Sequence, residues 1–447
     1  MFSSALLEPS IALLPAGDTW EDFYSTIGVT FESFCNEFTG SWQFRVVEAL
    51  KSVGVKTVTY YSSAQTANIQ RCNHLPTSST ICLLPAPRVY RAIVRKMTHP
   101  HPYLGYWGTL EELFGPREGI SRKFFAGLKQ AAPYVAQSVS LLARQIKRDN
   151  CRAILCQDYE HAGFDRAILV GHLLGLPVFA IFQGGVRDWN AIGRRLRPIT
   201  MRLCSGLIIG PVAEAERVRK EYGIDPSKVT QIFNPLSKDI WEDTNRRLAK
   251  KKLGLPAEAQ IISWHGRIEI FKKGLDVLIE SFVRLVQGRR HPNIHLAVLG
   301  AGPDSEEFMR KLEPVRSNVS WIDRFVSDRK FIRTFLSAGD VYAFPSRMEG
   351  LPVAPTEAMA CGLPVVAARA SGVHDIFIDG ESSGGIIVPP GDVDAFAQGL
   401  GKLLGNTSLR QVLSEHARYR ARAFSMEIVG PQLREVLLAE RLNPDQC

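Results

Sequence analysis

The sequence predicts an α/β protein that contains two doubly wound parallel sheets, one in each half of the chain. Short apolar runs bounded by Gly, Pro or polar residues alternate with helical segments almost throughout. Buried strands that alternate with helices are typical of such sheets. The pattern ends near "VTQIFNPLSKDIW" and starts again at "QIISWHG", and 447 residues are too many for one core.

In the first half, residues 25–34 ("STIGVTFESF") and 55–63 ("VKTVTYYSS") are expected to be strands, with a helix over 41–54 between them. The apolar runs that follow are expected to be strands as well: "TICLLPAP", "RAILCQD", "PVFAIF" and "GLIIG". Residues 87–148 are predicted to form a helical insertion. That insertion is basic, because it holds eleven Lys and Arg residues against three Glu.

In the second half, the predicted strands are "QIISWHG", "HLAVLGAG", "VSWID", "DVYAFPS" and "PVVAA", with helices between them. We therefore expect an N-terminal domain over 1–233 and a C-terminal domain over 234–425. Residues 426–447 are expected to form a helix and tail that return to the N-terminal domain.

Composition indicates where the chain works. No Lys or Arg precedes Arg45, whereas secretory signals and transit peptides need a cationic start. The longest apolar run, 167–182, is interrupted by His172 and Pro177 and is too short to span a bilayer. The eight cysteines form no Cys-x-x-Cys pair, a pattern that favours reduced thiols over a disulfide framework or a zinc site. We expect a cytoplasmic protein.

Two glutamates flank a turn between a predicted strand and a predicted helix. In "RMEGLPVAPTEAMACG", Glu349 and Glu357 stand eight positions apart. The helix is expected to begin near Ala354 with Pro355 at its first position, and to end at Gly362. Both carboxylates then lie at the carboxyl end of a parallel strand, where open α/β sheets bind ligands.

The chemistry of that turn fits a nucleotide sugar. Free amides around Gly350 and Leu351 favour a phosphate, whereas the two glutamates favour hydroxyl groups. The alternative is structural: Glu357 complements the helix dipole and Glu349 is a solvated loop charge.

A second group of residues favours the nucleotide sugar. Arg267 directly follows the strand "QIISWHG", and Lys273 comes six residues later, just before Gly274. Both cations are expected at the same edge of the sheet as the glutamates, where an Arg fork and a Lys point charge match diphosphate oxygens. The structural alternative pairs Arg267 with a loop acid and leaves Lys273 solvated.

These motifs carry a family resemblance. Residues 230–425 resemble the C-terminal half of retaining glycosyltransferases of family 4, also called glycosyl transferases group 1. The matching pieces are "FNPL", "GRIEIFKKGLDVLIESF", "VLGAGP", "AGDVYAFPSRMEGLPVAPTEAMACGLPVVAARASGVHDI" and "IVPPGDVDAFA". The resemblance implies the GT-B fold, in which two Rossmann-like domains face a cleft, and a metal-independent transfer of a hexosyl unit from a nucleoside diphosphate sugar with retention.

The resemblance also implies roles for individual residues. Arg267 and Lys273 match the diphosphate-binding cations of the family, and Glu349 matches the glutamate that contacts the sugar. Glu357 matches the glutamate that holds the ribose. Phe325 and Val326 match the turn that meets the base. Gly40 matches the loop that approaches the diphosphate. On the acceptor side, Asp158 is the first candidate and His161 is the second. The turn before Phe325 departs from the family, because Asp323 and Arg324 stand where a Gly is usual.

Two other functions, and one metal site, are alternatives to this interpretation. "VLGAGP" prompts an NAD-dependent oxidoreductase, although Gly300 and Gly302 lack the third glycine of that motif. A degenerate GT-B scaffold without catalysis is the other alternative. In "GDVD", Asp392 and Asp394 precede a predicted helix, so helix capping is favoured over metal binding. We expect no metal and no cofactor.

Basic clusters in the first half indicate the kind of partner. Besides the 87–148 insertion, five arginines follow "FQGG": 187, 194, 195, 197 and 202. Such clusters suit peripheral contact with the inner face of an anionic membrane, and equally a plain solvated surface. No aromatic pattern supports nucleic-acid binding. The acceptor class, whether glycan, lipid or small molecule, stays open.

Overall fold

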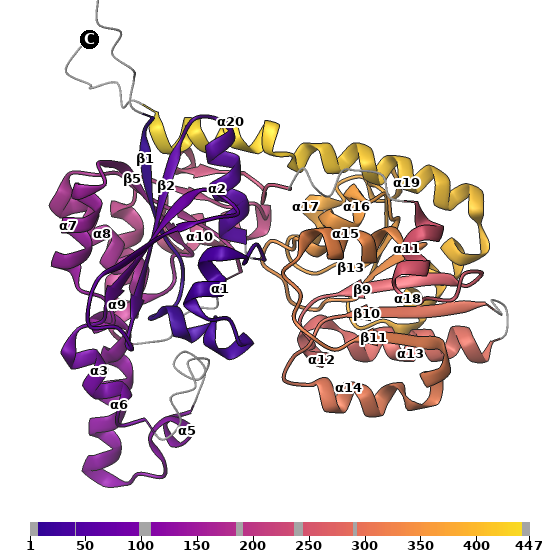
Figure 1. Ribbon diagram of the computed structural model, residues 1–447, viewed down its shortest axis with the longest axis horizontal. Coiled ribbons are helices and arrows are strands. Elements are labelled where there is room, and N and C mark those ends of the chain that lie inside the picture. The colour runs from indigo at the N-terminus through magenta and orange to yellow at the C-terminus, as the bar shows by residue number, and fades with distance from the viewer. Residues whose placement is uncertain are drawn as a thin grey trace, which may run out of the picture.

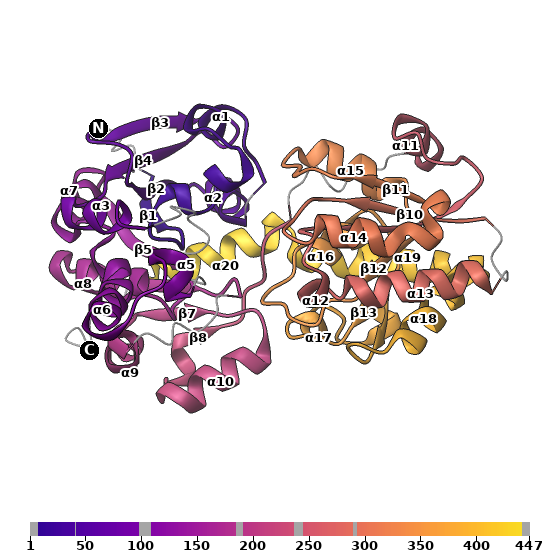
Figure 2. The same ribbon diagram turned by 90° about the horizontal axis from the view of Figure 1, so that it is seen from below.

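A computed structural model describes residues 8–40, 42–97, 109–184, 191–236, 245–288 and 293–439. Its strands form two separate sheets (Figures 1 and 2). The strands of the first sheet are β1 (Ser10–Leu14), β2 (Lys56–Ser63), β3 (Gln70–His74), β4 (Ser79–Pro85), β5 (Cys151–Gln157), β6 (Val178–Ile181), β7 (Gly206–Ile208) and β8 (Val229–Thr230). Their order is β3-β4-β2-β1-β5-β6-β7-β8, and all neighbours are parallel except β3 and β4.

The second sheet is wholly parallel, in the order β11-β10-β9-β12-β13-β14. Its strands are β9 (Gln260–His265), β10 (Ile294–Leu299), β11 (Val319–Ile322), β12 (Val341–Phe344), β13 (Val365–Ala368) and β14 (Gly385–Val388). The prediction of two doubly wound sheets is confirmed.

Helices cover both faces of each sheet. The N-terminal domain contains α1 (Phe31–Asn36), α2 (Trp42–Ser52), α3 (Arg88–Val94), α5 (Leu110–Phe114), α6 (Gly119–Val135), α7 (Val139–Arg148), α8 (Ala162–Leu174), α9 (Ala191–Leu203) and α10 (Val212–Tyr222). The rest of the chain contributes α11 (Arg246–Lys252), α12 (Ile270–Lys273), α13 (Leu275–Gln287), α14 (Ser305–Leu312), α15 (Arg329–Ser337), α16 (Ala354–Ala360), α17 (Val373–Ile376), α18 (Val393–Gly405), α19 (Thr407–Ala421) and α20 (Met426–Leu438).

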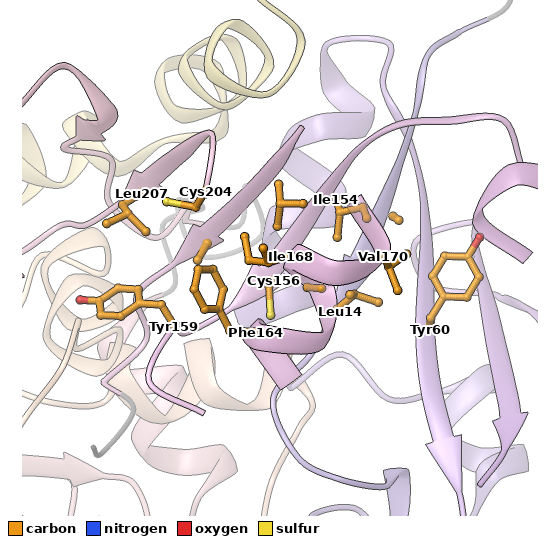
Figure 3. Packing of buried hydrophobic residues seen from close by; sticks show 14 of the residues in the cluster. Leu14, Tyr60, Ile154, Cys156, Tyr159, Phe164, Ile168, Val170, Cys204 and Leu207 are labelled. Carbon is orange, nitrogen blue, oxygen red and sulfur yellow. The ribbon is translucent and has the colours of Figure 1, made fainter. Parts of the chain in front are cut away.

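The two faces of the first sheet have separate cores. On one face, helices α7 and α8 pack Ile146, Phe164 and Ile168 against the strands (Figure 3). On the other face, α2 and α20 enclose a second cluster that includes Leu50 and Leu433. The burial of apolar side chains on both faces explains why these strands are continuous apolar runs rather than alternating ones.

The chain crosses between the sheets twice. The first sheet ends with β8 and the second begins with β9, and the boundary that we propose at Asn234 lies in this interval. The second crossing follows α19, where the Leu236 amide donates to the Phe424 carbonyl at 2.7 Å. Helix α20 then lies against α2 of the N-terminal domain (Figure 1).

The predicted strand over 25–34 is wrong. Residues Ser25–Ile27 form a 3-10 turn, Gly28 takes a left-handed φ of 73°, and α1 follows. The Thr30 side chain caps α1 by accepting from the Ser33 amide. Aromatic packing then decides the structure, because Phe34 is fully buried against Tyr24 and Phe38. Local capping and aromatic burial outweigh the strand propensity of this segment.

Four strands were not predicted. The central strand β1 has only five residues, β8 has only two, and β3 is an antiparallel edge strand with polar side chains, so none of them produces a long apolar run. Strand β14 overlaps the start of the motif "IVPPGDVDAFA", which was assigned to the family but not to a strand. The omissions change the strand order of both sheets but not their class.

One expectation about cysteines is also wrong. Cys35 of α1 and Cys72 of β3 form a disulfide, with 6.5 Å between their Cα atoms. The two residues are 37 positions apart, so no local spacing could reveal the pair. Five other described cysteines are free thiols: 82, 151, 156, 204 and 361.

The basic segments fold differently from one another. The described residues of the 87–148 insertion are mainly helical, as predicted, and α3, α5 and α6 form the lower end of the N-terminal domain in Figure 1. Of the second cluster, Arg197 is buried and pairs with Asp165 at 2.9 Å, so it does not belong to a basic surface. Arg187 lies outside the described residues. Within the described ranges, no helix is long and apolar enough to cross a membrane.

Candidate functional site

The turn that carries Glu349 is bonded to the helix that carries Lys273. After β12, the amides of Arg347 and Met348 both donate to the Lys272 carbonyl, at 3.0 and 3.3 Å. Arg347 also pairs with Asp276 through two bonds of 2.6 and 2.7 Å. These contacts place the Lys273 ammonium 2.8 Å from the Glu349 carboxylate, at the carboxyl edge of the second sheet.

Arg267 occupies the neighbouring loop, directly after β9. Its side chain is about one-third exposed, and its Nε lies 3.4 Å from Glu269. The loop is held against the next one by two glycines. A Cβ at Gly300 would lie 1.8 Å from the Gly266 carbonyl oxygen, and one at Gly302 would lie 2.2 Å from that of Ile268. Backbone packing therefore accounts for the "GAG" sequence, and no dinucleotide is needed to explain it.

Glu357 lies at the centre of a buried polar network. It stands in the first turn of α16 and is 3 % exposed. Its Oε1 accepts a bond from Arg45 Nη2, which comes from α2 of the N-terminal domain. Its Oε2 lies 2.9 Å from His265 Nε2, and the Tyr342 hydroxyl lies 3.0 Å from His265 Nδ1.

The partners of Glu357 keep it ionised. Burial alone would raise the pKa of this carboxyl, but Arg45 and His265 outweigh burial and lower the pKa to about 2. Because an ionised carboxylate only accepts hydrogen bonds, His265 Nε2 must be the donor in their contact. Two of the four lone-pair positions of the carboxylate are used, which leaves acceptor capacity for hydroxyl groups of a ligand.

The turn at Gly350 and Leu351 also packs against the N-terminal domain. A Cβ at Gly350 would lie 2.1 Å from the Cα of Gly184, so the two backbones touch and only glycine fits. The Leu351 side chain lies against Gly210, and its carbonyl accepts from the Asn234 side chain at 3.3 Å. The predicted phosphate position is therefore at the interface of the two domains.

Gly40 meets the predicted base-binding turn. A Cβ at Gly40 would lie 2.7 Å from Ser327 Cβ and 3.5 Å from the Phe325 ring. The Phe325 ring stacks on Phe38 with 6.1 Å between centroids, and Val326 packs at the edge of the second-domain core. The structure brings the predicted base turn and the predicted N-terminal loop into direct contact.

The two candidates on the acceptor side differ in what their side chains contact. Asp158 has a left-handed φ of 53°, is 6 % exposed, and accepts from the Gln183 amide at 2.7 Å, next to Gly184. His161 caps α8: its Nδ1 accepts from the Gly163 amide and its Nε2 lies 2.7 Å from the Gln157 carbonyl. Burial lowers the pKa of His161 to about 4. Both ring nitrogens are used by the backbone, which favours a structural role for His161.

Of the two aspartates of "GDVD", Asp392 caps a helix as predicted, whereas Asp394 forms an ion pair. Asp392 caps α18 by accepting from the Ala395 amide at 2.9 Å, and Asp394 pairs with Arg284. Among the described residues, no three His, Cys, Asp or Glu side chains lie close enough together to hold a metal ion.

Two residues of the site were not assigned to it from the sequence. His265 ends strand β9 and was not named as a candidate, yet it donates to Glu357. Arg45 is 312 positions from Glu357 and belongs to no motif. Its signal was a charged residue inside the apolar run "FRVV", where it is 7 % exposed. A charged residue on the buried face of a helix requires a partner, and here the partner is in the other domain.

Comparisons with known proteins relate the C-terminal domain to one family of enzymes. Residues 259–406 match the family described as Glycosyl transferases group 1. The chain is 28 % identical over 240 residues to the D-inositol 3-phosphate glycosyltransferase of Xylanimonas cellulosilytica, a match that covers 52 % of this chain and 56 % of the relative. The chain thus spans about half the length of the curated relatives it matches.

Solved structures match nearly the whole chain. Sucrose-phosphate synthase from Thermosynechococcus elongatus has a TM-score of 0.67 at 18 % identity, covering 96 % of this chain and 98 % of that one. HepE of Anabaena, determined in complex with UDP, has a TM-score of 0.67 at 13 % identity, covering 97 % and 100 %. At these identities the likeness concerns the fold.

Proposed function

We propose that this chain transfers a hexosyl unit from a nucleoside diphosphate sugar to an acceptor hydroxyl, with retention. The premise is that residues 259–406 match the glycosyl transferases group 1 family and that the two domains together have the GT-B fold. The observation that carries the proposal is the Lys273–Glu349 pair beside Arg267 at the carboxyl edge of the second sheet. The pair supplies a cation for a phosphate and a carboxylate for sugar hydroxyls in one place.

Each of these residues is assigned to one part of the donor. Arg267, Lys273 and the amides of Gly350 and Leu351 stabilise the charge that develops on the leaving diphosphate, and a single preorganised hydrogen-bond donor of this kind is worth roughly 3–4 kcal/mol. Glu349 holds the sugar and Glu357 holds the ribose. Phe325 and Val326 meet the base, and Gly40 lets the N-terminal loop approach the diphosphate.

For the chemical step we propose attack from the face of the leaving group. The bond from the anomeric carbon to the phosphate oxygen breaks, the bond to the acceptor oxygen forms, and the phosphate oxygen takes the proton of the acceptor hydroxyl. No metal takes part in this scheme. A glycosyl adduct trapped on Glu349 would contradict it, because a covalent intermediate requires a nucleophile on the protein.

The acceptor is proposed to bind in the N-terminal domain, with Asp158 near its hydroxyl. Asp158 supports this because its bond to Gln183 places it beside the Gly184–Gly350 contact. A cavity of about 240 Å³ lies between residues 18–22 and helices α3 and α6, and Arg91 and Gln65 are among its lining residues. The relatives named D-inositol 3-phosphate glycosyltransferase are matched over only about half of their own length, so their name does not identify the acceptor of this chain.

A hydrolysis screen tests the proposal. Purified protein is incubated with UDP-, GDP- and ADP-sugars, and the release of the nucleoside diphosphate is followed without any acceptor. We expect slow release from one nucleotide class. A protein that releases none of them but still binds a nucleoside diphosphate would be the non-catalytic scaffold. A protein that binds NADH and no nucleoside diphosphate would be the oxidoreductase.

We also propose that α6 contacts an anionic membrane. Ile120 and Phe124 share one face of this helix and are 88 % and 55 % exposed. Arg122 and Lys123 beside them are exposed, and the Lys96 ammonium lies 6.0 Å from the centre of the Phe124 ring. Exposed apolar side chains among cations are typical of helices that lie in a membrane interface. In Figure 1, α6 projects from the lower end of the N-terminal domain.

Vesicle flotation tests the membrane proposal. The chain should float with vesicles that contain phosphatidylglycerol and not with pure phosphatidylcholine. I120S/F124S should abolish flotation. The matched control L169S/L173S changes two residues of α8 that are also exposed, at 48 % and 61 %, and should leave flotation intact. Equal loss in both variants would contradict a specific role for α6.

A further inference from the structure

The contact between Arg45 and Glu357 joins the two domains at the proposed ribose position. Arg45 is on α2 of the N-terminal domain, and Glu357 begins α16 of the C-terminal domain. The two side chains are 9 % and 5 % exposed. Removing a charged pair from water is unfavourable unless every group finds partners, so a buried pair across a domain interface calls for an explanation.

Glu357 and Arg45 differ in how many of their buried polar atoms are hydrogen-bonded. Both oxygens of Glu357 have partners, one from each domain. Arg45 Nη2 donates to Glu357, whereas Arg45 Nη1 is buried and has no hydrogen-bond partner in the described part of the chain. Buried guanidinium nitrogens almost always find an acceptor, because an unpaired charged donor loses its hydration without compensation. A bound ligand is one way to supply that acceptor.

The place of Arg45 indicates which ligand. Glu357 lies beside it, and the contacts of Gly40 with Ser327 and of Gly350 with Gly184 also join the two domains. A guanidinium pairs well with phosphate oxygens, and a nucleotide whose ribose reaches Glu357 carries its phosphates next to the ribose.

Resting on the proposed function, we infer that Arg45 is a nucleotide-contacting residue supplied by the N-terminal domain: its Nη1 donates to a phosphate oxygen of the nucleoside diphosphate while its Nη2 holds Glu357. Because Arg45 and Glu357 belong to different domains, the full set of nucleotide contacts exists only when the domains are closed. Nucleotide binding and domain closure are then coupled by one side chain.

A second interdomain pair provides a matched control. Arg329 of α15 is 5 % exposed and donates to Glu48 of the same helix α2, at 2.6 and 2.8 Å, and to the Thr39 carbonyl. It links the same two domains with similar burial but does not touch Glu357 in any contact described here. Loss of Arg329 should loosen the interface without removing a nucleotide contact.

Calorimetry on the full chain tests the inference. The nucleoside diphosphate that binds the wild type best among UDP, GDP and ADP is titrated into R45M, R45K and R329M. The parent nucleoside, which has no phosphate, is measured by saturation-transfer NMR. We expect R45M to raise the Kd of the diphosphate about tenfold or more, R45K to raise it less, and R329M to change it less than twofold. The Kd of the nucleoside should rise much less than that of the diphosphate.

Each other outcome overturns the inference. An unchanged diphosphate Kd in R45M means that Arg45 is purely structural. Equal losses for nucleoside and diphosphate mean that Arg45 acts only through Glu357. Equal losses in R45M and R329M mean that any loosening of the interface weakens binding. If R45M does not fold, the same comparison is made with R45K: its Kd for the diphosphate should rise more than its Kd for the nucleoside. A wild type that binds none of the three diphosphates would instead overturn the proposed function.

Discussion

The carboxyl edges of the two sheets use their polar side chains in different ways. In the C-terminal domain, Glu349 pairs with Lys273 and Glu357 pairs with Arg45 and His265, so side chains contact side chains. In the N-terminal domain, the two candidate residues of the acceptor side contact the backbone instead. Asp158 accepts from the Gln183 amide, and His161 spans the Gly163 amide and the Gln157 carbonyl.

The two kinds of contact differ in whether a ligand can replace one of the partners. A side-chain pair such as Lys273–Glu349 can exchange its partner for a phosphate or a hydroxyl without disturbing the fold. A side chain that satisfies the backbone cannot leave without exposing a buried N–H or C=O group. The C-terminal edge is therefore suited to binding chemistry, whereas the N-terminal edge fixes the shape of loops against which an acceptor lies.

The largest expected effect comes from Glu349→Gln. The variant keeps the shape of the side chain but removes the charge that faces Lys273 and the proposed sugar. We expect nucleotide-sugar hydrolysis to fall by about a hundredfold or more, since preorganised polar contacts of active sites contribute on this scale.

Release of the nucleoside diphosphate measures the effect of Glu349→Gln, and a thermal melt shows that the variant is folded. Asp394→Asn is the control, because it breaks an exposed ion pair in the same domain. Hydrolysis that survives Glu349→Gln would remove the distinction between the two edges.

Gly350→Ala tests the point where the edges touch. The added Cβ would lie 2.1 Å from the Cα of Gly184, so the backbones of the two domains must separate. We expect hydrolysis to fall about tenfold and small-angle scattering to report a larger radius of gyration. Gly127→Ala, where no atom lies within 4 Å of the new Cβ, should change neither quantity. A fully active Gly350→Ala protein would show that this contact is dispensable.

The double variant C35S/C72S tests whether the disulfide contributes to stability without affecting nucleotide binding. The disulfide closes a loop of 37 residues in the N-terminal domain, and its loss should lower the free energy of unfolding by about 2–4 kcal/mol. The affinity for a nucleoside diphosphate should not change, because neither cysteine belongs to the proposed site. Urea unfolding and calorimetry measure the two quantities. Reductant added to the wild type should reproduce the loss of stability, and an unchanged stability would contradict the role of this bond.

The smallest expected effect is a change in pH dependence. Burial lowers the pKa of His161 to about 4 from an ordinary 6.5, so the unfolded chain takes up a proton first as the pH falls. The stability that His161 contributes is complete above pH 6.5 and is lost as the pH falls towards 4. His161→Asn keeps a capping side chain without this titration. Its stability should fall less steeply between pH 6.5 and 4, and an identical slope would contradict the burial argument.

The same contrast explains what the sequence could predict. The grouping of Arg267, Lys273, Glu349 and Glu357 at one sheet edge could be predicted because all four lie in the short segments that follow apolar strands, where position along the chain determines position in space. The N-terminal domain depends on contacts between distant residues. Arg45 meets Glu357 across 312 positions and Cys35 meets Cys72 across 37, and neither pairing leaves a local pattern.

Local sequence patterns also gave wrong predictions where packing between distant segments determines the structure. Residues 25–34 have strand-like composition, yet Thr30 caps a helix and Phe34 buries its ring in an aromatic cluster. Strand β1 has the central place beside β2 and β5 but only five residues, too few to stand out. Burial of side chains from several distant segments determines these elements, and that information is absent from any single window of sequence.

A crystal structure of the chain with its nucleoside diphosphate would locate the ligand relative to the four proposed site residues. We expect the pyrophosphate between the side chains of Arg267 and Lys273 and the amides at Gly350, with the ribose hydroxyls on Glu357. A pyrophosphate bound elsewhere, with Lys273 still paired to Glu349, would contradict this expectation.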